Sequence, residues 1–360
     1  MFHVVLNRPS ALGEKARGAS AGENPRHSMH DLALRLRAQV HDGTNVTPAR
    51  LDAVLARMTR TKPLWWSIAR RLRREVRPGD VIFCTGEDVG LIVALLCGAR
   101  SRRCHVAVMA HRVDTTKKRM ALLAFRGRSR VALFTTVCSR QAEVLGTLVK
   151  NGGPRTICMW DQTDTLFFSP GPSTAAKSRP LIASVGLESR DYATLATATE
   201  DLDVDVRISG YSADTRVLAE AFPMTMPRNM ERRFHTWREL VQLYRDADVV
   251  VVSLYPNAYA AGVQALMEAL ACGRPTVVTS TVGLRDYIED PAVRCVRPGD
   301  ADDMRAVLLE IIENPEESER LGQAAATLAA ERHSCEAYVE RLVTELRALS
   351  NHGEYPVTAR

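Results

Sequence analysis

The chain has 360 residues, of which 46% are hydrophobic and 25% are charged. These values exclude a disordered or collagen-like chain, and the length predicts two domains, each with its own core. Every apolar run is shorter than the roughly 18 residues that cross a bilayer, and Met1–Pro9 lacks a signal-peptide pattern. We therefore expect a cytoplasmic protein.

The eight cysteines are scattered, without a CxxC pair, and no histidine cluster has the spacing of metal ligands. We expect reduced thiols, no metal and no cofactor.

Charge is divided unequally along the chain, whose net charge is +6. Residues 1–177 hold 29 Lys and Arg against 13 Asp and Glu, whereas residues 178–360 hold 19 against 29. Basic clusters attract anionic lipid, nucleic acid or polyanionic substrates, but a solvated helix face explains any single cluster equally well. No nucleic-acid-binding motif accompanies the charge, so we expect no nucleic-acid partner. A peripheral contact with an anionic membrane at its inner face, with 117–134 as the docking segment, is the partner that the charge favours.

In chain order, a strand at 2–6 leads into a polar segment, 13–30, which we expect to be a mobile loop. Gly13 in this loop is a candidate for contact with a substrate or a phosphate, because glycine allows the backbone to come close to a ligand. Strands then alternate with helices, which is typical of a parallel sheet with crossover helices. The strands are expected at 80–84, 105–110 and 131–137, and the helices at 88–97, 119–125 and 140–150.

The segment 171–180 is rich in Pro, Ser, Gly and Ala and is the expected linker. It separates an N-terminal domain at 1–170 from a C-terminal domain at 181–335, and a final helix at 336–350 has the length to pack back across the hinge. The expected fold class is α/β, with two Rossmann-like, doubly wound domains facing each other across a cleft. In the second domain we expect strands at 181–185, 204–209, 247–254 and 276–280, and helices at 193–199, 212–221, 237–244 and 262–271.

The residues that are best suited to bind a ligand lie in and around the helix expected at 262–271. Gly262 allows the backbone to come close to a ligand at the start of a helix whose free N–H groups favour a diphosphate. Glu268, about two turns into this apolar helix, could accept hydrogen bonds from ribose hydroxyls. The alternative is that Glu268 is an exposed helix residue.

The segment YPNAYAAGVQALMEALACGRPTVVTSTVGLRDYIED at 255–290 resembles the donor-site signature of retaining GT-B glycosyltransferases, especially family 4. That signature has the form E-x7-E, then A-x-G-x-P-V, then a Gly-Leu turn. Glu268 matches the second glutamate, and Gly283 and Leu284 match the turn. Ala260 stands where the first glutamate, which contacts the donor sugar in those enzymes, would be.

Three further stretches resemble the same family in the same order: 160–170 with Asp164 and Phe168 at matched positions, 181–195, and 238–252. The resemblance implies a GT-B fold and a donor site in the C-terminal domain. The donor-binding residues that it implies are Gly186, Arg190, Gly210, Tyr259, Ala261, Gly262, Val263 and Glu268.

Three residues are implied to be catalytic: His111, Arg190 and Glu268. The usual Arg and Lys pair of the family is missing from the loop after 181–185, so Arg190 is the candidate for neutralising the leaving diphosphate. The alternative is that Arg190 forms an ion pair with Asp191 or with a surface acid. His111 follows an apolar strand at the sheet edge where open α/β folds bind ligands, with Asp114 nearby as an acceptor-side candidate; a structural histidine is the alternative.

The resemblance implies a hexosyltransferase of polysaccharide or glycoconjugate biosynthesis. It would move a sugar from a nucleoside diphosphate sugar to a glycan, lipid-linked or small-molecule acceptor, with retention and without a metal. Two other functions stay open: a non-catalytic nucleotide-sugar-binding protein, and a sugar-nucleotide epimerase of the same fold.

Overall fold

The computed structural model describes residues 1–98, 103–125, 131–149, 153–174, 177–211, 220–288 and 290–351. It contains two compact units. The N-terminal unit comprises 1–16, 27–160 and 338–360, and the C-terminal unit comprises 17–26 and 161–337. The main change from one unit to the other therefore falls between Trp160 and Asp161, before the segment 171–180 that we expected to be the linker.

The N-terminal unit is built on a six-stranded parallel sheet in the order β2-β1-β3-β4-β5-β6. All six residues of β4 are buried, as expected for a strand covered on both faces by helices. The strands are β1 (Phe2–Val5), β2 (Gln39–His41), β3 (Val81–Cys84), β4 (His105–Ala110), β5 (Val131–Thr136) and β6 (Arg155–Cys158).

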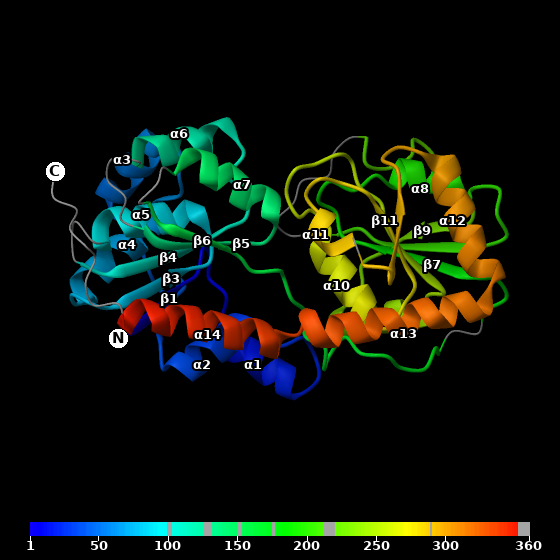
Figure 1. The fold of residues 1–360 in the computed structure, drawn as a ribbon, viewed down its shortest axis with the longest axis horizontal. Coiled ribbons are helices and arrows are strands. Elements are labelled where there is room, and N and C mark those ends of the chain that lie inside the picture. Colours follow the sequence, from blue (N-terminus) through cyan, green and yellow to red (C-terminus); the bar gives the residue numbers. More distant parts are fainter. Residues whose placement is uncertain are drawn as a thin grey trace. The chain divides into compact units, whose positions relative to one another are not determined.

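Helices cover both faces of this sheet (Figure 1). One face packs against α3 (Arg50–Thr59), α4 (Pro63–Glu75), α5 (Glu87–Cys97), α6 (Thr116–Phe125) and α7 (Ser139–Leu148). The other face packs against α2 (Ser28–Leu36) and α14 (Cys335–Asn351). The C-terminal helix thus supplies Leu342 and Val343 to the core of the N-terminal unit.

The expected loop at 13–30 is wrong at both ends, because α1 (Leu12–Ser20) occupies its first part and α2 begins at Ser28. Gly13 lies in the first turn of this helix and not in a loop. Glu14, Lys15, Ala16 and Arg17 are good helix formers, and Leu12 is buried, so local propensity and one apolar anchor outweigh the glycines.

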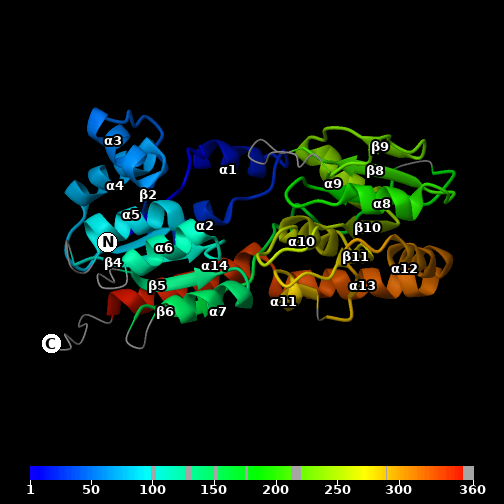
Figure 2. The same cartoon turned by 90° about the horizontal axis from the view of Figure 1, so that it is seen from above.

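The C-terminal unit has a second six-stranded parallel sheet, in the order β12-β11-β10-β7-β8-β9. Figure 2 shows β11, β10, β8 and β9 in succession. The strands are β7 (Leu181–Val185), β8 (Asp205–Ser209), β9 (Met230–Arg232), β10 (Val249–Val252), β11 (Thr276–Thr279) and β12 (Val293–Val296). The four consecutive valines of β10 are all buried, which places this strand at the centre of the core.

Two helical layers cover this sheet as well. One face packs against α9 (Trp237–Asp246), α10 (Val263–Ala271), α11 (Arg285–Ile288) and α13 (Pro315–Arg332). The other face packs against α8 (Tyr192–Thr199) and α12 (Ala301–Glu313). The helix expected at 212–221 lies outside the described residues for nearly all its length.

A buried ion pair ties residues 17–26 into the C-terminal unit. Arg26 donates to both carboxylate oxygens of Asp164: its backbone N lies 2.7 Å from Oδ2, and its Nε and Nη2 lie 2.9 and 2.6 Å from Oδ1. Asp164 is only 4% exposed. Burial alone would raise the pKa of Asp164, but the hydrogen bonds and charge of Arg26 hold it below its usual value.

We expect Arg26→Met to lower the free energy of unfolding by about 3 to 5 kcal/mol, because it leaves a buried carboxylate unpaired. Since the pKa of Asp164 is depressed in the folded state, this contribution is present above about pH 4 and disappears as the pH falls through the folded pKa. Urea unfolding at pH 7 and pH 3 measures both effects. Arg233→Met is the control, because Arg233 pairs with Glu239 at the exposed surface, 3.3 Å away, and its loss should leave the free energy of unfolding nearly unchanged.

Candidate functional site

Several sequence-predicted site residues meet at the carboxyl edge of the C-terminal sheet. Gly186 directly follows β7 with φ +102°, and Gly210 directly follows β8. The segment 253–262 leaves β10 at the same edge and leads into α10. In open α/β sheets this edge is where ligands bind.

Helix α10 begins here without a side-chain cap. Its N-cap is Gly262, at φ +86°, and no side chain accepts a hydrogen bond from the first turn. A Cβ at Gly262 would lie 2.8 Å from Val252 Cγ1 and 3.2 Å from Arg190 Nη1, so glycine is required by both conformation and space. Ala261 and Val263 on either side are buried. The Val263 N–H donates to the Ala260 carbonyl, 3.4 Å away, so the N–H groups that follow it in the first turn are the ones that an anion could bind.

The loop before α10 is held in place by the Gly283 turn. A Cβ at Gly283 would lie 1.9 Å from the carbonyl oxygen of Tyr259 and 2.6 Å from its nitrogen. The Gly283 N–H also donates to the Asn257 carbonyl, 3.2 Å away. Backbone therefore packs directly on backbone, which fixes the position of Tyr259 and of Ala260 beside it.

Glu268 is not an exposed helix residue, so that alternative is wrong. It is 4% exposed, and its carboxylate accepts hydrogen bonds from Tyr244 Oη at 2.8 Å and Gln264 Nε2 at 3.2 Å. Burial raises its pKa to about 7, although both hydrogen bonds and the charge of Arg190 oppose the rise. Two donors leave lone pairs on the carboxylate for ligand hydroxyl groups.

We expect Tyr244→Phe to raise the pKa of Glu268 further, because it removes a hydrogen bond that stabilises the charged carboxylate. The pH above which a nucleotide binds tightly should therefore shift upward, while the affinity at pH 9 changes little. Titration calorimetry from pH 6 to 9 measures the shift. An unchanged pH profile with uniformly weaker binding would contradict this role for Tyr244.

Arg190 packs against Gly186 and Gly262 and does not form an ion pair. It is 3% exposed, and its guanidinium donates to the Val185 carbonyl, at 2.9 Å from Nε and 2.7 Å from Nη2, and to the Glu188 carbonyl at 3.0 Å from Nη1. The alternative pairing with Asp191 is wrong, because Asp191 instead caps α8 by accepting from Thr194 N.

Within the described ranges, no carboxylate lies within ion-pair distance of Arg190. A Cβ at Gly186 would lie 2.3 Å from its Nη2, so the guanidinium fits only beside a glycine. The hydrogen bonds of this buried guanidinium go to neutral groups, the backbone carbonyls and Tyr192, so an adjacent anion would stabilise its charge. It lies beside the uncapped start of α10, where both features favour the same ligand.

The side chains of Glu188 and Tyr259, which the sequence did not suggest as partners, contact each other close to Gly186. Tyr259 Oη lies 3.1 Å from Glu188 Oε1 and 2.9 Å from Ser189 Oγ. The segments 189–191 and 253–255 also pair through backbone hydrogen bonds. Glu188 thereby brings an exposed carboxylate next to the residue that precedes Ala260. No local pattern in the sequence could reveal this contact across 71 residues.

Aromatic side chains beyond Gly210 were also missed. Tyr211 and Phe234 are 48% and 65% exposed, and their rings meet edge to face with centroids 6.1 Å apart. Arg232 lies over Tyr211, 4.7 Å from the ring centroid, and donates to the Gly210 carbonyl. Exposed aromatic faces at this edge can stack on a planar ring.

In the N-terminal unit, His111 directly follows β4 and is exposed. Its N–H donates to Glu87 Oε2 at 3.1 Å, and its Nε2 lies 3.2 Å from the Thr85 carbonyl. Glu87 is buried and bound to Lys118 Nζ. Burial alone would raise the pKa of Glu87, but Lys118 lowers it below its usual value. Asp114 is half-buried, with Oδ1 3.8 Å from Arg112 Nε.

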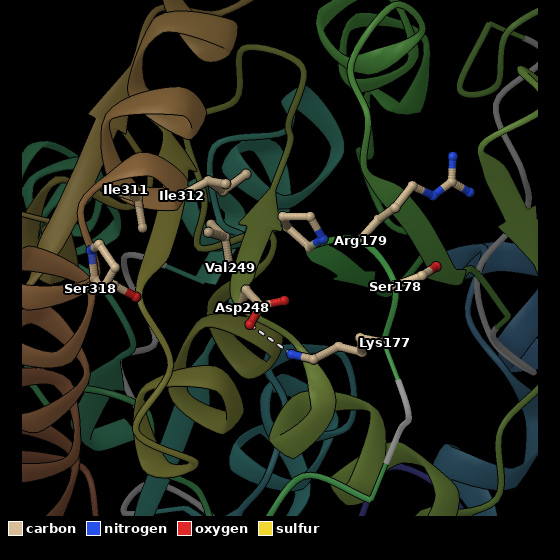
Figure 3. Close-up of a pocket in the computed structure, with 10 residues that line it drawn as sticks. Lys177, Ser178, Arg179, Asp248, Val249, Ile311, Ile312 and Ser318 are labelled. Atoms are coloured by element: carbon tan, nitrogen blue, oxygen red, sulfur yellow. Dashed lines mark hydrogen bonds and ion pairs between the residues drawn. The ribbon is translucent and has the colours of Figure 1, made fainter.

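A separate pocket of about 340 Å³ opens at the opposite edge of the C-terminal sheet (Figure 3). Lys177, Arg179 and Pro180 line it just before β7, and Asp248 lines it just before β10. Lys177 Nζ is 2.6 Å from Asp248 Oδ1, and Arg179 pairs with Asp205. Its cations are neutralised by these partners, so we do not place the site there.

Among the described residues, no group of three or more His, Cys, Asp or Glu side chains is arranged to hold a metal ion. In the same part of the chain, none of the helices has the length and hydrophobicity to span a membrane.

Residues 230–328 match the family model described as glycosyl transferases group 1. The comparison with curated proteins gave no match. Among solved structures, sucrose-phosphate synthase from Thermosynechococcus elongatus has a TM-score of 0.71 and 16% identity, over 97% of this chain and 99% of that one. HepE from Anabaena, solved in complex with UDP-glucose, has a TM-score of 0.67 and 13% identity, over 97% and 100%. OtsA has a TM-score of 0.64 and 14% identity, over 96% and 99%. The fold is therefore GT-B.

Proposed function

We propose that this chain, a GT-B glycosyltransferase whose residues 230–328 belong to group 1, transfers a sugar from a nucleoside diphosphate sugar bound at the carboxyl edge of the C-terminal sheet. The observation that carries the proposal is the buried carboxylate of Glu268 on α10, a helix that begins at Gly262 without a side-chain cap and next to the buried guanidinium of Arg190. Each group matches one part of such a donor: the ribose hydroxyls and the diphosphate.

Further residues around the donor site have proposed partners on the ligand. The turns at Gly186 and Gly210 allow close approach of the diphosphate and of the base, and Tyr211 and Phe234 stack on the base. Glu188, held by Tyr259, supplies the carboxylate for the sugar hydroxyls that Ala260 cannot provide. Because HepE was solved with UDP-glucose, UDP-glucose is the first donor to test.

In the proposed reaction the bond between the anomeric carbon and the diphosphate oxygen breaks, and a bond to the acceptor hydroxyl oxygen forms with retention. The acceptor proton moves to the leaving phosphate oxygen. The charge that develops on this leaving group is stabilised by the N–H groups of α10 and by Arg190, without a resident metal. In the N-terminal unit, His111 is proposed to contact the reacting sugar, with Gly13 and Asp114 on the acceptor side.

The test is consumption of UDP-glucose by the purified chain, followed by chromatography of released UDP and by NMR of the sugar product. We expect UDP release that rises with a suitable acceptor hydroxyl and is absent in Glu268→Ala. Binding without UDP release would favour the non-catalytic alternative. A new sugar-nucleotide isomer in the absence of acceptor would identify an epimerase.

A further inference from the structure

The N-terminal unit presents an unusual surface on α3. Leu51, Val54 and Met58 are 52%, 55% and 76% exposed and follow the i, i+3, i+7 spacing, so their side chains share one face of the helix. Such a stripe normally faces the core. Here Asp52 and Ala56 face the core instead.

Every exposed charge on this helix is positive. Arg50 and Arg57 are exposed beside the apolar stripe, and Arg60 follows at its C-terminal end. The only acidic residue of α3, Asp52, is buried and accepts hydrogen bonds from Arg70 Nη1 at 2.8 Å and from Ser67 Oγ at 2.7 Å. No acidic side chain of α3 is therefore available to repel an anionic surface.

Helix α6 extends the same pattern. Its sequence contains no acid; Lys117 and Arg119 are exposed, and Met120 and Leu123 are 63% and 40% exposed at i, i+3. Lys117 Nζ donates to the Arg60 carbonyl at 2.5 Å, which joins the start of α6 to the end of α3. Figure 1 shows both helices on the same side of the sheet. Five of the nine large hydrophobic side chains exposed in the described part of this unit lie on these two helices.

We propose that α3, together with the start of α6, is a docking surface for an anionic lipid bilayer. Basic residues that flank an exposed apolar stripe are the pattern of a helix that lies in a membrane interface, where the apolar side chains enter the acyl boundary and the cations meet headgroup phosphates. A second copy of the same chain would place equal positive charges against one another. A nucleic acid offers phosphates but no acyl boundary to receive Leu51, Val54 and Met58.

This surface refines the expected membrane contact. The segment 117–134 was the expected docking element, but residues 126–130 lie outside the described ranges, and α3 was not expected to take part. The inference does not depend on glycosyl transfer, so its failure would leave the donor site untouched.

The test is co-sedimentation of the full chain with vesicles of phosphatidylcholine alone or of equal parts phosphatidylcholine and phosphatidylglycerol, at low and high salt. We expect binding to the anionic vesicles only, weakened by salt. Leu51→Asn combined with Val54→Asn and Met58→Asn should weaken it at least tenfold, and Arg50→Glu with Arg57→Glu should abolish it. Leu34→Asn is the control, because Leu34 is 64% exposed on α2 and lies outside the proposed surface.

Folding of each variant is checked by circular dichroism and by nucleoside diphosphate binding, which these surface changes should leave intact. Three results would overturn the proposal: no binding to anionic vesicles at low salt, binding that survives the triple change, and duplex DNA that binds more tightly than vesicles and competes with them. Dissociation of a wild-type dimer by the triple change, without vesicle binding, would instead assign α3 to self-association.

Discussion

Glu268→Gln is expected to weaken binding of a nucleoside diphosphate by roughly ten- to a hundredfold at pH 8, because hydrogen bonds to a charged acceptor contribute about 1.5 to 3 kcal/mol each. Glutamine keeps the size of the side chain and the contact with Tyr244 but carries no charge. Titration calorimetry measures the loss. Glu310→Gln, on α12 at the other face of the sheet, is the control and should bind like wild type.

The same group makes binding dependent on pH. Burial raises the pKa of Glu268 to about 7, and ribose hydroxyls donate to the ionised form. Below pH 7 the carboxyl must lose a proton before it accepts both hydroxyls, so affinity should fall about tenfold per pH unit. With a nucleoside diphosphate sugar as the ligand, whose phosphates do not titrate over this range, the affinity of Glu268→Gln should not vary. A wild-type affinity that is constant from pH 6 to 8 would contradict the assignment.

The free energy of unfolding should depend on pH in the opposite direction from the affinity for the ligand. An unfolded glutamate titrates near pH 4.3, so between about pH 4.3 and 7 the folded state holds a proton that the unfolded state has lost. The free energy of unfolding therefore falls as pH rises through this range, by roughly 4 kcal/mol from this group alone. Glu268→Gln removes that loss, so the variant should gain stability over wild type between pH 5 and 8.

Gly283→Ala is expected to be the most destabilising single methyl addition in the C-terminal unit. The new Cβ would lie 1.9 Å from the Tyr259 carbonyl oxygen and 2.3 Å from its carbonyl carbon. Backbone atoms cannot rotate away as a side chain can, so the turn and the loop before α10 must separate. Overpacking of this kind costs about 1 to 3 kcal/mol and occasionally more, and we expect the upper end.

Displacement of the loop should also weaken binding of the donor, because Tyr259 and the N-cap Gly262 move with the loop. Urea unfolding gives the first effect and nucleotide titration the second. Gly146→Ala is the matched control: Gly146 lies in α7, a Cβ there meets nothing within 4 Å, and alanine should stabilise the helix by about 0.5 to 1 kcal/mol. If Gly283→Ala kept wild-type stability and affinity, the close packing described here would be wrong.

The sheet framework could be predicted because each buried parallel strand is a short apolar run between turn residues. The four valines of β10 and the run at 105–110 gave such signals, and the expected GT-B fold is confirmed. Glycine at 262, before an apolar helix with one carboxylate, likewise marked the start of α10. These features depend on local pattern.

The contacts that could not be predicted are mostly those between residues that belong to different elements of the fold. An ion pair between Arg190 and its neighbour Asp191 was the alternative that the sequence left open, but the guanidinium reaches the Val185 carbonyl because two glycines leave room for it. The contact between Glu188 and Tyr259 and the burial of Glu268 against Tyr244 join different elements of the fold. The loop expected at 13–30 failed for the reverse reason, because glycines were given more weight than the helix formers beside them.

Hydrogen–deuterium exchange of the full chain, with and without UDP-glucose, tests the donor site most directly. We expect saturating ligand to slow exchange at 186–190 and at 257–268, and Glu268→Ala to abolish this protection. The peptides around the pocket at 177–180 and 311–318 should exchange at the same rate in both states. Protection confined to that pocket, or unchanged exchange at 186–190 and 257–268 with a series of nucleoside diphosphate sugars, would contradict the proposed donor site.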